Sequence, residues 1–596
     1  MIKLSDYLFQ FLAEKGVRRV FMLPGGGAMH LNDSLGRCPA IEYTCFLHEQ
    51  ALAIAVEAYG QFTNSPGVGL VTSGPGATNA ITGVAAAYID STPALFISGQ
   101  AKRPDLKGDS GVRQMGSQEV DIVSMVSCIT KYAVTILEPA EIRHHLEKAW
   151  HLATSGRKGP VWLDIPLDVQ AAQIDENLLQ GFVPDVPKEE KIQKFDHSVG
   201  QIIELLNASE RPLVLAGNGV KLADAQQALC RFAETNQIPM LLTWKTIDFL
   251  DQDHPLNFGS PGIMGCRTAN FLVQNCDLLL VLGSRLDPSI TAFNHAGFGK
   301  NAKKVMVDID EAEIRKISGI DVPIVSDAGE FLLALNVRQT DVSPHTRTEW
   351  LSYCLRLKSK YPVVLEEYRH SGEKINLYVF TDMLFEQLSP EDIITPESSG
   401  AAGEVTYQAI RVKKGQKIKN AAGLGAMGFG LPYSIGACLA SNRKRTILIN
   451  GDGAFQMNIQ ELETVVRLKL PIKMFIFDNN GYGSIMATQR NMFDGRYVGS
   501  EPGSGLTLPD LSGIAKAYGI RFERATCHQD LPDVISRTLK GDDAVICNVL
   551  VSDNHVTAPK VQAMKTPEGS MISKPLEDMW PYLTPEELSE NTIVKQ

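Results

Sequence analysis

The hydrophobic positions of this chain form short apolar runs that alternate with longer stretches of helical periodicity. Runs of β-branched or apolar residues occupy positions 20–23, 68–72, 94–98, 161–165, 213–216, 278–282, 305–307, 446–449, 473–477 and 544–550. Strands that alternate with helices are typical of parallel sheets with crossover connections. The pattern therefore predicts an α/β protein built from doubly wound parallel sheets.

Two polar stretches interrupt this alternation and suggest domain boundaries. The first covers residues 185–194, and the second is a charged, helix-like segment at 347–360. A chain of 596 residues is too long for one hydrophobic core. We therefore predict domains at 1–185, 195–340 and 360–565, followed by a tail at 566–596. The alternative is that both stretches are surface loops inside one larger domain.

Prolines recur near the C-terminal end, at Pro559, Pro567, Pro575, Pro581 and Pro585. Proline interrupts helices, so this segment cannot form one long helix. It is expected to wrap over a surface as a packed arm, or alternatively to form a lid over an active site.

Composition and charge exclude several classes of function. The chain is 44% hydrophobic and 21% charged, with a net charge of −11 and no long basic run, which argues against nucleic-acid binding. The start contains Lys3 and Asp6 rather than a secretory apolar region, and the weakly charged stretch 67–89 is broken by Gly and Pro. We expect a cytoplasmic protein that has no membrane partner.

Candidate chemistry appears after two of the predicted strands. The run 446–449 leads into Asn-Gly-Asp-Gly-Ala-Phe at 450–455, and the run 473–477 delivers Asp-Asn-Asn-Gly-Tyr at 478–482. Glycines let a backbone approach a diphosphate at a helix N-terminus. Asp452 and Asn480 would then supply hard oxygen ligands to a Mg²⁺ ion that bridges the diphosphate. The alternative is that the Gly-Asp-Gly triplet is only a turn.

This Gly-Asp-Gly to Asn-Asn unit resembles the signature of thiamin-diphosphate-dependent enzymes. A second motif agrees: Phe-Met-Leu-Pro-Gly-Gly-Gly at 21–27 is followed by Glu49, which opens the predicted helix 51–60. The resemblance implies that Glu49 hydrogen-bonds to the aminopyrimidine ring and activates the cofactor. The alternative for Glu49 is a helix-capping or solvent-facing carboxylate.

Similarity to acetolactate synthase-like enzymes covers nearly the whole chain, through blocks at 72–79, 155–161, 423–432 and 456–462. It implies pyrimidine-binding, central nucleotide-binding-like and diphosphate-binding domains, in that order. Asp452, Asn480 and the Tyr482 carbonyl would hold the metal, and Gln118 would lie near the reacting carbon. The remaining implied thiamin diphosphate contacts are Ser399, Gly400, Met427, Gly453 and Ala454. Met427 is alternatively an adaptable core methionine.

The middle domain resembles that of flavin-containing relatives, through residues 213–220, 281–287 and 305–310. Ser289 stands where those relatives carry an arginine. A middle domain without a nucleotide is the alternative. The FAD contacts implied by the resemblance are Arg157, Gly217, Gly219, Thr243, Gly262, Arg285, Asp287, Asp308 and Asp327.

Two departures from the family pattern bear on the substrate. Ser117 and Gln489 stand where acetolactate synthases usually carry a phenylalanine and a tryptophan. Loss of aromatic volume predicts a wider and wetter acceptor pocket. The chain is thus interpreted as a lyase or transferase dependent on thiamin diphosphate and Mg²⁺. This carboligase would decarboxylate a 2-oxo acid, most simply pyruvate, and transfer the two-carbon unit to a carbonyl acceptor such as a ketone or keto-sugar.

The first alternative is an acetolactate synthase catalytic subunit that condenses two 2-oxo acids and works with a small regulatory subunit. Decarboxylase or acetyl-phosphate-forming activity comes next, and a non-catalytic scaffold is a further alternative. The resemblance also implies that Glu49 of one subunit faces the metal motif of another. We therefore expect a homodimer or homotetramer.

Overall fold

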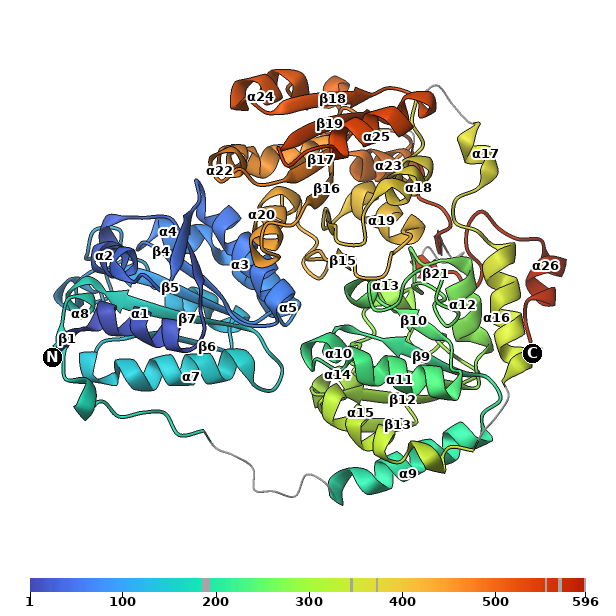
Figure 1. The fold of residues 1–596 in the computed structure, drawn as a ribbon, viewed down its shortest axis with the longest axis horizontal. Helices are drawn as coiled ribbons and strands as arrows, with labels where there is room; N and C mark the ends of the chain where they lie inside the picture. The colour runs from blue at the N-terminus through green and yellow to red at the C-terminus, as the bar shows by residue number, and fades with distance from the viewer. Residues whose placement is uncertain (185–192, 344–346, 371–373, 553–554, 566–570, 594–596) are drawn as a thin grey trace.

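Three parallel β-sheets, each covered by helices on both faces, make up the molecule (Figure 1). The computed structural model describes residues 1–184, 193–343, 347–370, 374–552, 555–565 and 571–593. The first linker expected from the sequence, 185–194, lies mostly outside the described residues. The predicted α/β architecture of three doubly wound parallel sheets is confirmed.

The N-terminal sheet has six strands in the order β3-β2-β4-β5-β7-β6. Successive residues of a strand face opposite sides, so Leu95 and Phe96 enter two different cores. Helices α1, α2 and α7 cover one face, and α3 and α5 cover the other. The elements are α1 Leu4–Glu14, β2 Arg19–Met22, α2 Met29–Arg37, β3 Glu42–Cys45, α3 Glu49–Thr63, β4 Gly67–Val71, α5 Ile81–Ile89, β5 Ala94–Gln100, β6 Tyr132–Thr135, α7 Ile142–Thr154 and β7 Pro160–Pro166.

The middle sheet has five strands in the order β10-β9-β11-β12-β13. One face packs on α9, α11 and α15, and the other packs on α12 and α16. The elements are α9 Gln193–Ala208, β9 Pro212–Ala216, α11 Gln226–Asn236, β10 Met240–Leu242, α12 Arg267–Asn275, β11 Leu278–Leu282, β12 Lys303–Asp308, β13 Val322–Val325, α15 Ala328–Val337 and α16 Thr348–Lys360.

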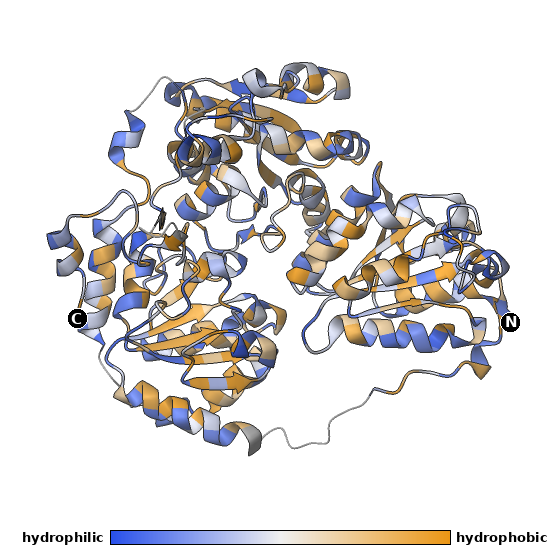
Figure 2. Ribbon diagram, turned by 180° about the vertical axis from the view of Figure 1, so that it is seen from behind, coloured by the Kyte–Doolittle hydropathy of each residue, from blue (hydrophilic) through white to orange (hydrophobic). Residues whose placement is uncertain are grey.

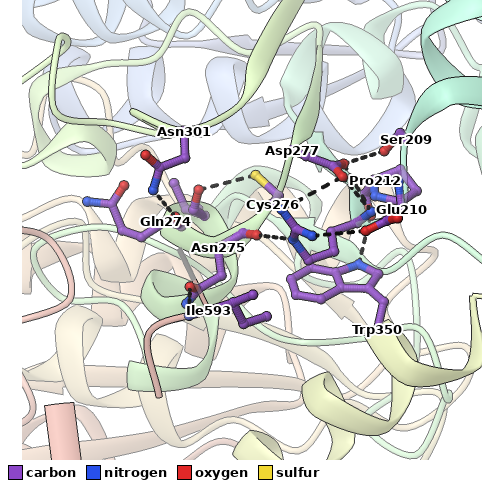
Figure 3. Close-up of polar contacts among 12 residues, drawn as sticks. Ser209, Glu210, Pro212, Gln274, Asn275, Cys276, Asp277, Asn301, Trp350 and Ile593 are labelled. Carbon is purple, nitrogen blue, oxygen red and sulfur yellow. Dashed lines mark hydrogen bonds and ion pairs between the residues drawn. The ribbon is translucent and has the colours of Figure 1, made fainter. Parts of the chain in front are cut away.

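The charged segment expected as a boundary at 347–360 is helix α16, and it is docked rather than free. Trp350 and Cys354 are buried in the core of the middle domain. The indole Nε1 of Trp350 donates a hydrogen bond to the carbonyl oxygen of Pro212, at the start of β9, at 3.0 Å (Figure 3). Trp350, Cys354 and Leu357 form the buried face of this helix.

The C-terminal sheet has six strands in the order β15-β14-β16-β17-β19-β18. The elements are α18 Leu377–Gln387, β14 Ile393–Pro396, α19 Gly400–Ala409, β15 Lys417–Ile418, α20 Gly430–Ala440, β16 Thr446–Gly451, α21 Asp452–Phe455, α22 Leu462–Arg467, β17 Ile472–Asp478, α23 Gly483–Met492, α24 Leu511–Tyr518, β18 Arg521–Ala525, α25 Leu531–Leu539 and β19 Val545–Leu550. Every apolar run predicted as a strand is a strand in one of the three sheets, with ends that shift by one or two residues.

The N-terminal and C-terminal domains share a hydrophobic core where α3 packs on α20. Gly436 makes this close approach possible, since a Cβ at that position would lie 2.4 Å from the carbonyl oxygen of Ala55. The helix that Glu49 begins is therefore fixed against the helix that precedes β16. Both candidate motifs start from elements of this shared core.

The C-terminal segment after β19, from residue 555 onward and called the tail from here on, packs against the middle domain as an arm (Figure 1). It contains β20 Ala563–Lys565, β21 Met571–Ser573 and α26 Pro585–Glu590. The side chain of Asn275, at the end of α12, donates to the carbonyl oxygen of Asn591 at 3.1 Å. It also accepts from the amide of Ile593 at 2.7 Å (Figure 3). Nearer the start of α12, the side-chain amide of Asn270 donates to the carbonyl oxygen of Leu576 in the tail at 2.9 Å.

Apolar residues concentrate on the three sheets, whereas the surrounding helices alternate between apolar and polar residues (Figure 2). Within the described ranges, no helix combines the length and the apolar character that crossing a bilayer requires.

Candidate functional site

The Gly-Asp-Gly motif lies at the carboxyl end of β16, and the Asn-Asn motif lies at the end of the neighbouring strand β17. Gly451 pairs with Phe477, so the two loops leave the sheet side by side. Asp452 joins them, because its Oδ1 accepts from the amide of Gly453 at 2.8 Å and its Oδ2 accepts from the amide of Gly481 at 3.2 Å. The two motifs, which follow two predicted strands in the sequence, thus lie at one edge of the sheet.

The Asp452 carboxyl is buried, and its electrostatics suit a bound cation. Burial raises its pKa to about 7, and the neighbouring Asp478 carboxylate adds to the rise. A cation held at this carboxylate would offset the cost of burying its charge. A divalent metal with oxygen ligands fits this chemistry, since the Asn480 amide and the Tyr482 carbonyl provide the neutral oxygens of the predicted set.

The loop that carries Asn480 has a fixed and unusual backbone. Asn480 adopts a left-handed conformation with φ +59°, which asparagine tolerates better than most residues. Gly481 cannot carry a side chain, since a Cβ would lie 2.3 Å from the carbonyl oxygen of Ser500. The ring of Tyr482 fills the space beside Gly453, where a Cβ would come within 2.5 Å of it. These constraints explain Gly453 and Gly481, whereas a Cβ at Gly451 would have no atom within 4 Å.

A cavity of about 580 Å³ opens beside these loops. It extends to residues of the middle domain and of the tail, among them Met264 and His555. Asn480 itself is not among the lining residues, although its neighbours Asn479 and Gly481 are. The predicted residues that line the cavity are Ser399, Gly400, Met427, Asp452, Gly453, Ala454 and Tyr482.

Glu49 is the first residue of α3 and is buried at the edge of the N-terminal sheet. Its Oε2 accepts from the side-chain amide of Asn79 at 3.0 Å. Gly76 leaves room beside its other oxygen, since a Cβ there would lie 3.4 Å from Oε1. Glu49 does not line the cavity that contains Asp452. Within one chain, the structure does not bring the two predicted groups into one cavity.

Gln118 is exposed and adopts a left-handed conformation with φ +57°. Its carbonyl oxygen lies above Gly74, where a Cβ would come within 2.3 Å of it. The next residue, Glu119, closes the loop by accepting hydrogen bonds from the amides of Met115 and Gly116 at 2.8 and 3.1 Å. Like Glu49, Gln118 does not line the described cavity. A strained backbone held in place by such contacts is a frequent feature of functional sites.

The two positions expected to widen an acceptor pocket do not line the cavity within one chain. Gln489 faces away from it, because its side chain accepts from the Ser500 hydroxyl at 2.6 Å and donates to the Val498 carbonyl oxygen at 3.0 Å. Ser117 is exposed beside Gln118. Gln489 therefore braces the loop at 498–500 in this structure.

The residues predicted to bind FAD lie around the carboxyl edge of the middle sheet, although several of them also have a role in packing or in helix capping. Gly219 is required for packing, since a Cβ would lie 2.7 Å from the Cα of Gly283. Asp287 and Asp327 cap α13 (Pro288–Thr291) and α15. None of the predicted FAD contacts lines the cavity described above. Those set at strand ends of this edge are Gly217 after β9, Thr243 after β10, Arg285 after β11 and Asp308 at the end of β12.

Arg157 approaches this edge from the N-terminal domain and forms ion pairs across the domain boundary. Its guanidinium contacts Asp310 and Glu313, each at 2.8 Å. Gly262, by contrast, adopts φ +120°, and a Cβ there would meet the carbonyl oxygen of Ser289 at 2.4 Å. Shared placement at one edge is compatible with a nucleotide site, but these contacts also explain Arg157 and Gly262 without one.

Several groups that line the cavity were not predicted from the sequence. Glu397 follows β14, and its carboxylate accepts from the amides of Ser398 at 2.8 Å and Gly430 at 3.0 Å. Burial raises its pKa to about 7. The others are Glu404 on α19 and, in the tail, His555, Thr557 and Lys560. An acidic residue directly after an apolar run was the available signal for Glu397; the tail residues carry no motif.

Comparison with known proteins places all three domains. Family models match residues 2–125 as the N-terminal TPP binding domain, 199–335 as the central domain and 399–549 as the C-terminal TPP binding domain of thiamine pyrophosphate enzymes. The chain is 32% identical to the acetolactate synthase isozyme 2 large subunit of Escherichia coli over 96% of this chain and 99% of that protein.

Two further relatives show the same extent of similarity. The acetolactate synthase large subunit of Lactococcus lactis is 32% identical over 94% of both chains. The probable acetolactate synthase large subunit of Methanocaldococcus jannaschii is 31% identical over 92% of both chains. Similarity thus extends across all three domains.

Proposed function

The chain belongs to the acetolactate synthase-like family of thiamin-diphosphate-dependent enzymes, and we propose that it decarboxylates a 2-oxo acid and joins the two-carbon unit to a second 2-oxo acid. Pyruvate is the proposed donor. The observation that carries this proposal is the cavity in which Asp452, Gly453 and Ser399 meet. The names of the relatives support acetolactate formation and give no support to a keto-sugar acceptor.

Residues at the ends of β16 and β17 would anchor the cofactor. Asp452, Asn480 and the Tyr482 carbonyl would hold Mg²⁺, and amides at Ser399, Gly400, Gly453 and Ala454 would meet the diphosphate. Met427, which lines the same cavity, would support the thiamin rings. When bound, thiamin diphosphate supplies the carbon nucleophile and the electron sink of the reaction.

Glu49 and Gln118 would complete the site from a second subunit. Within one chain neither lines the cavity that contains Asp452. Glu49 would hydrogen-bond to the pyrimidine ring of the cofactor and control a proton there. Gln118 would hydrogen-bond to oxygen atoms on which negative charge develops. A homodimer, or a homotetramer of two such pairs, is the proposed active form, and a small regulatory subunit is a proposed additional partner.

FAD binding at the carboxyl edge of the middle sheet is a further part of the proposal. It is supported by the shared placement of Gly217, Thr243, Arg285 and Asp308 at that edge. Ligands of open α/β sheets bind at this end of the strands. Absorbance of the purified protein in the visible region, followed by identification of the released nucleotide, would test it directly.

Product analysis tests the main proposal. Purified enzyme with thiamin diphosphate, Mg²⁺ and pyruvate should release CO₂ and form acetolactate, and added 2-oxobutanoate should give the mixed product. Omission of the cofactor is the control. Rapid carboligation to a neutral ketone or a keto-sugar, with no acetolactate from pyruvate alone, would overturn the choice of acceptor. No CO₂ release from any 2-oxo acid would overturn the proposed donor.

A further inference from the structure

The tail contributes directly to the wall of the candidate site. Its segment at 555–560 lines the cavity together with Met264 of the middle domain and Glu404 of α19. Lys560 is held at both of its backbone groups by Trp580, with N to O distances of 2.9 and 2.7 Å. The side chain of this lysine therefore starts from a fixed point on the cavity wall.

Lys560 is half-buried on the cavity wall, close enough to the Glu404 carboxylate for its charge to oppose the rise in pKa that burial gives that group. Across the described ranges its ammonium group forms neither an ion pair nor a hydrogen bond. The nearby Glu404 carboxylate instead accepts from the hydroxyl of Thr557 at 3.0 Å, and burial raises the pKa of Glu404. Lys560 thus has a carboxylate nearby but no ion pair with it, and burial favours the neutral form of that carboxylate, so the ammonium group can bind a negatively charged ligand.

A second polar group of the same segment also lacks a partner. The Nε2 atom of His555 is buried and makes no hydrogen bond in the described structure. Burial lowers the pKa of His555 to about 4, so its ring is neutral near pH 7. A neutral imidazole presents one N–H donor and one acceptor. His555 can thus hydrogen-bond to a carbonyl or hydroxyl oxygen of a ligand that Lys560 attracts.

The other cationic side chain on the cavity wall is Arg490 of α23, and it already has an interaction partner. Lys560 is therefore the cationic side chain of the cavity wall that we expect to bind an anionic ligand. The proposed reaction brings two carboxylates to the site. The donor loses its carboxylate as CO₂, whereas the acceptor 2-oxo acid keeps its carboxylate throughout the reaction. A fixed cationic side chain can therefore bind the acceptor carboxylate both in the substrate complex and in the transition state.

We propose that Lys560 binds the carboxylate of the acceptor 2-oxo acid and that His555 Nε2 is a second polar contact to the same molecule. This inference rests on the proposed function, because it assigns the residue that would select a 2-oxo acid over a neutral carbonyl compound. It makes the tail a part of the acceptor site. The segment at 555–560 is accordingly more than a structural arm.

A competition between acceptors tests this inference. The holoenzyme is supplied with pyruvate as donor and with equal amounts of 2-oxobutanoate and benzaldehyde, and both products are measured by mass spectrometry. In Lys560→Met the ratio of 2-oxo acid product to aldehyde product should fall about 10- to 100-fold, as expected for loss of a charge-assisted hydrogen bond. Lys560→Arg should restore most of the ratio. Lys516→Met, at an exposed position of α24, is the control and should leave the ratio unchanged.

Two measurements distinguish the other outcomes. If Lys560→Met leaves the ratio unchanged, the inference is wrong. If this variant instead weakens thiamin diphosphate binding, measured by titration calorimetry with Mg²⁺, Lys560 meets the diphosphate and the inference is also wrong. A wild-type enzyme that couples pyruvate to benzaldehyde but never to a 2-oxo acid would overturn the proposed function together with this assignment.

Discussion

Asp452 and Gly481 are joined by a hydrogen bond of 3.2 Å from the Gly481 amide to the Asp452 carboxylate, which links the loops that follow β16 and β17. The bond explains why an acidic residue and a glycine at this spacing belong to one site. It leaves the Asp452 carboxylate buried, where backbone amides, among them that of Gly453, and the side-chain amide of Asn479 donate to it.

Asp452→Asn should lower the Mg²⁺-dependent affinity for thiamin diphosphate by about 100-fold or more, because an amide replaces the charged metal ligand. The fold should persist, since asparagine can still accept from the Gly481 amide. Titration calorimetry gives the affinity, and Tm without cofactor provides the control. Unchanged cofactor affinity in this variant would show that the metal is held elsewhere.

Glu49→Gln should leave cofactor binding intact and reduce turnover roughly 100- to 10,000-fold, because the amide cannot exchange a proton with the cofactor ring. Turnover is measured as CO₂ release from pyruvate. Undiminished turnover would remove Glu49 from the mechanism while leaving the metal site unaffected.

Co-expression of Glu49→Gln and Asp452→Asn chains with different tags tests whether the site is shared between subunits. In a mixed dimer, one site would combine both defects and the other would be intact, so mixed dimers should recover about half of the wild-type activity per dimer. Each variant alone should stay inactive. Failure of purified mixed dimers to regain activity would place both groups in the same chain's site.

The sequence predicted the central strands well and the edges of the sheets poorly. Strands β4, β5, β7 and β9 are buried throughout and mostly apolar because helices cover both of their faces, and such runs are visible in a sequence. The edge strands β3, β6 and β18 are partly exposed and carry mixed residues. Their place depends on pairing with a neighbouring strand, which no local pattern encodes.

The site likewise contains residues that a local sequence pattern reveals and residues whose position depends on tertiary packing. Asp452 and Asn480 could be predicted because two loops at neighbouring strand ends must meet, whatever the rest of the fold does. Lys560 could not be predicted, because it reaches the cavity only through the packing of the tail on the middle domain. Gln489, which the sequence suggested as a pocket residue, instead hydrogen-bonds to Ser500 in the loop that follows α23.

Gly436→Ala should destabilise the contact between α3 and α20, because the added Cβ would lie 2.4 Å from the carbonyl oxygen of Ala55. Overpacking of this kind typically costs about 1–3 kcal/mol. Gly36→Ala in α2 is the matched control, since no atom lies within 4 Å of the added carbon there, and it should be neutral or slightly stabilising. Denaturant titration of both variants measures the difference, and equal free energies of unfolding would contradict the close approach.

Glu57→Gln should stabilise the protein at alkaline pH. Glu57 is fully buried in α3, and its Oε1 accepts from the Gln61 amide at 2.7 Å. Burial, with the nearby Asp90 carboxylate, raises the pKa of Glu57 well above its ordinary value of 4.5, although Lys245 opposes the rise. The folded protein therefore holds a proton that the unfolded chain releases, so this group reduces stability as pH rises above 4.5.

In Glu57→Gln the side-chain oxygen can still accept the hydrogen bond from Gln61, and the amide does not titrate. The difference in Tm between Glu57→Gln and wild type should be near zero at pH 4.5 and should grow with pH, until pH passes the raised pKa of Glu57 in the folded state. Thermal unfolding at several pH values measures it. Glu463→Gln, at an exposed position of α22, is the control and should show no such growth. A Tm difference that shrinks as pH rises would mean that Glu57 is ionised and held by Lys245, and that burial does not dominate its protonation.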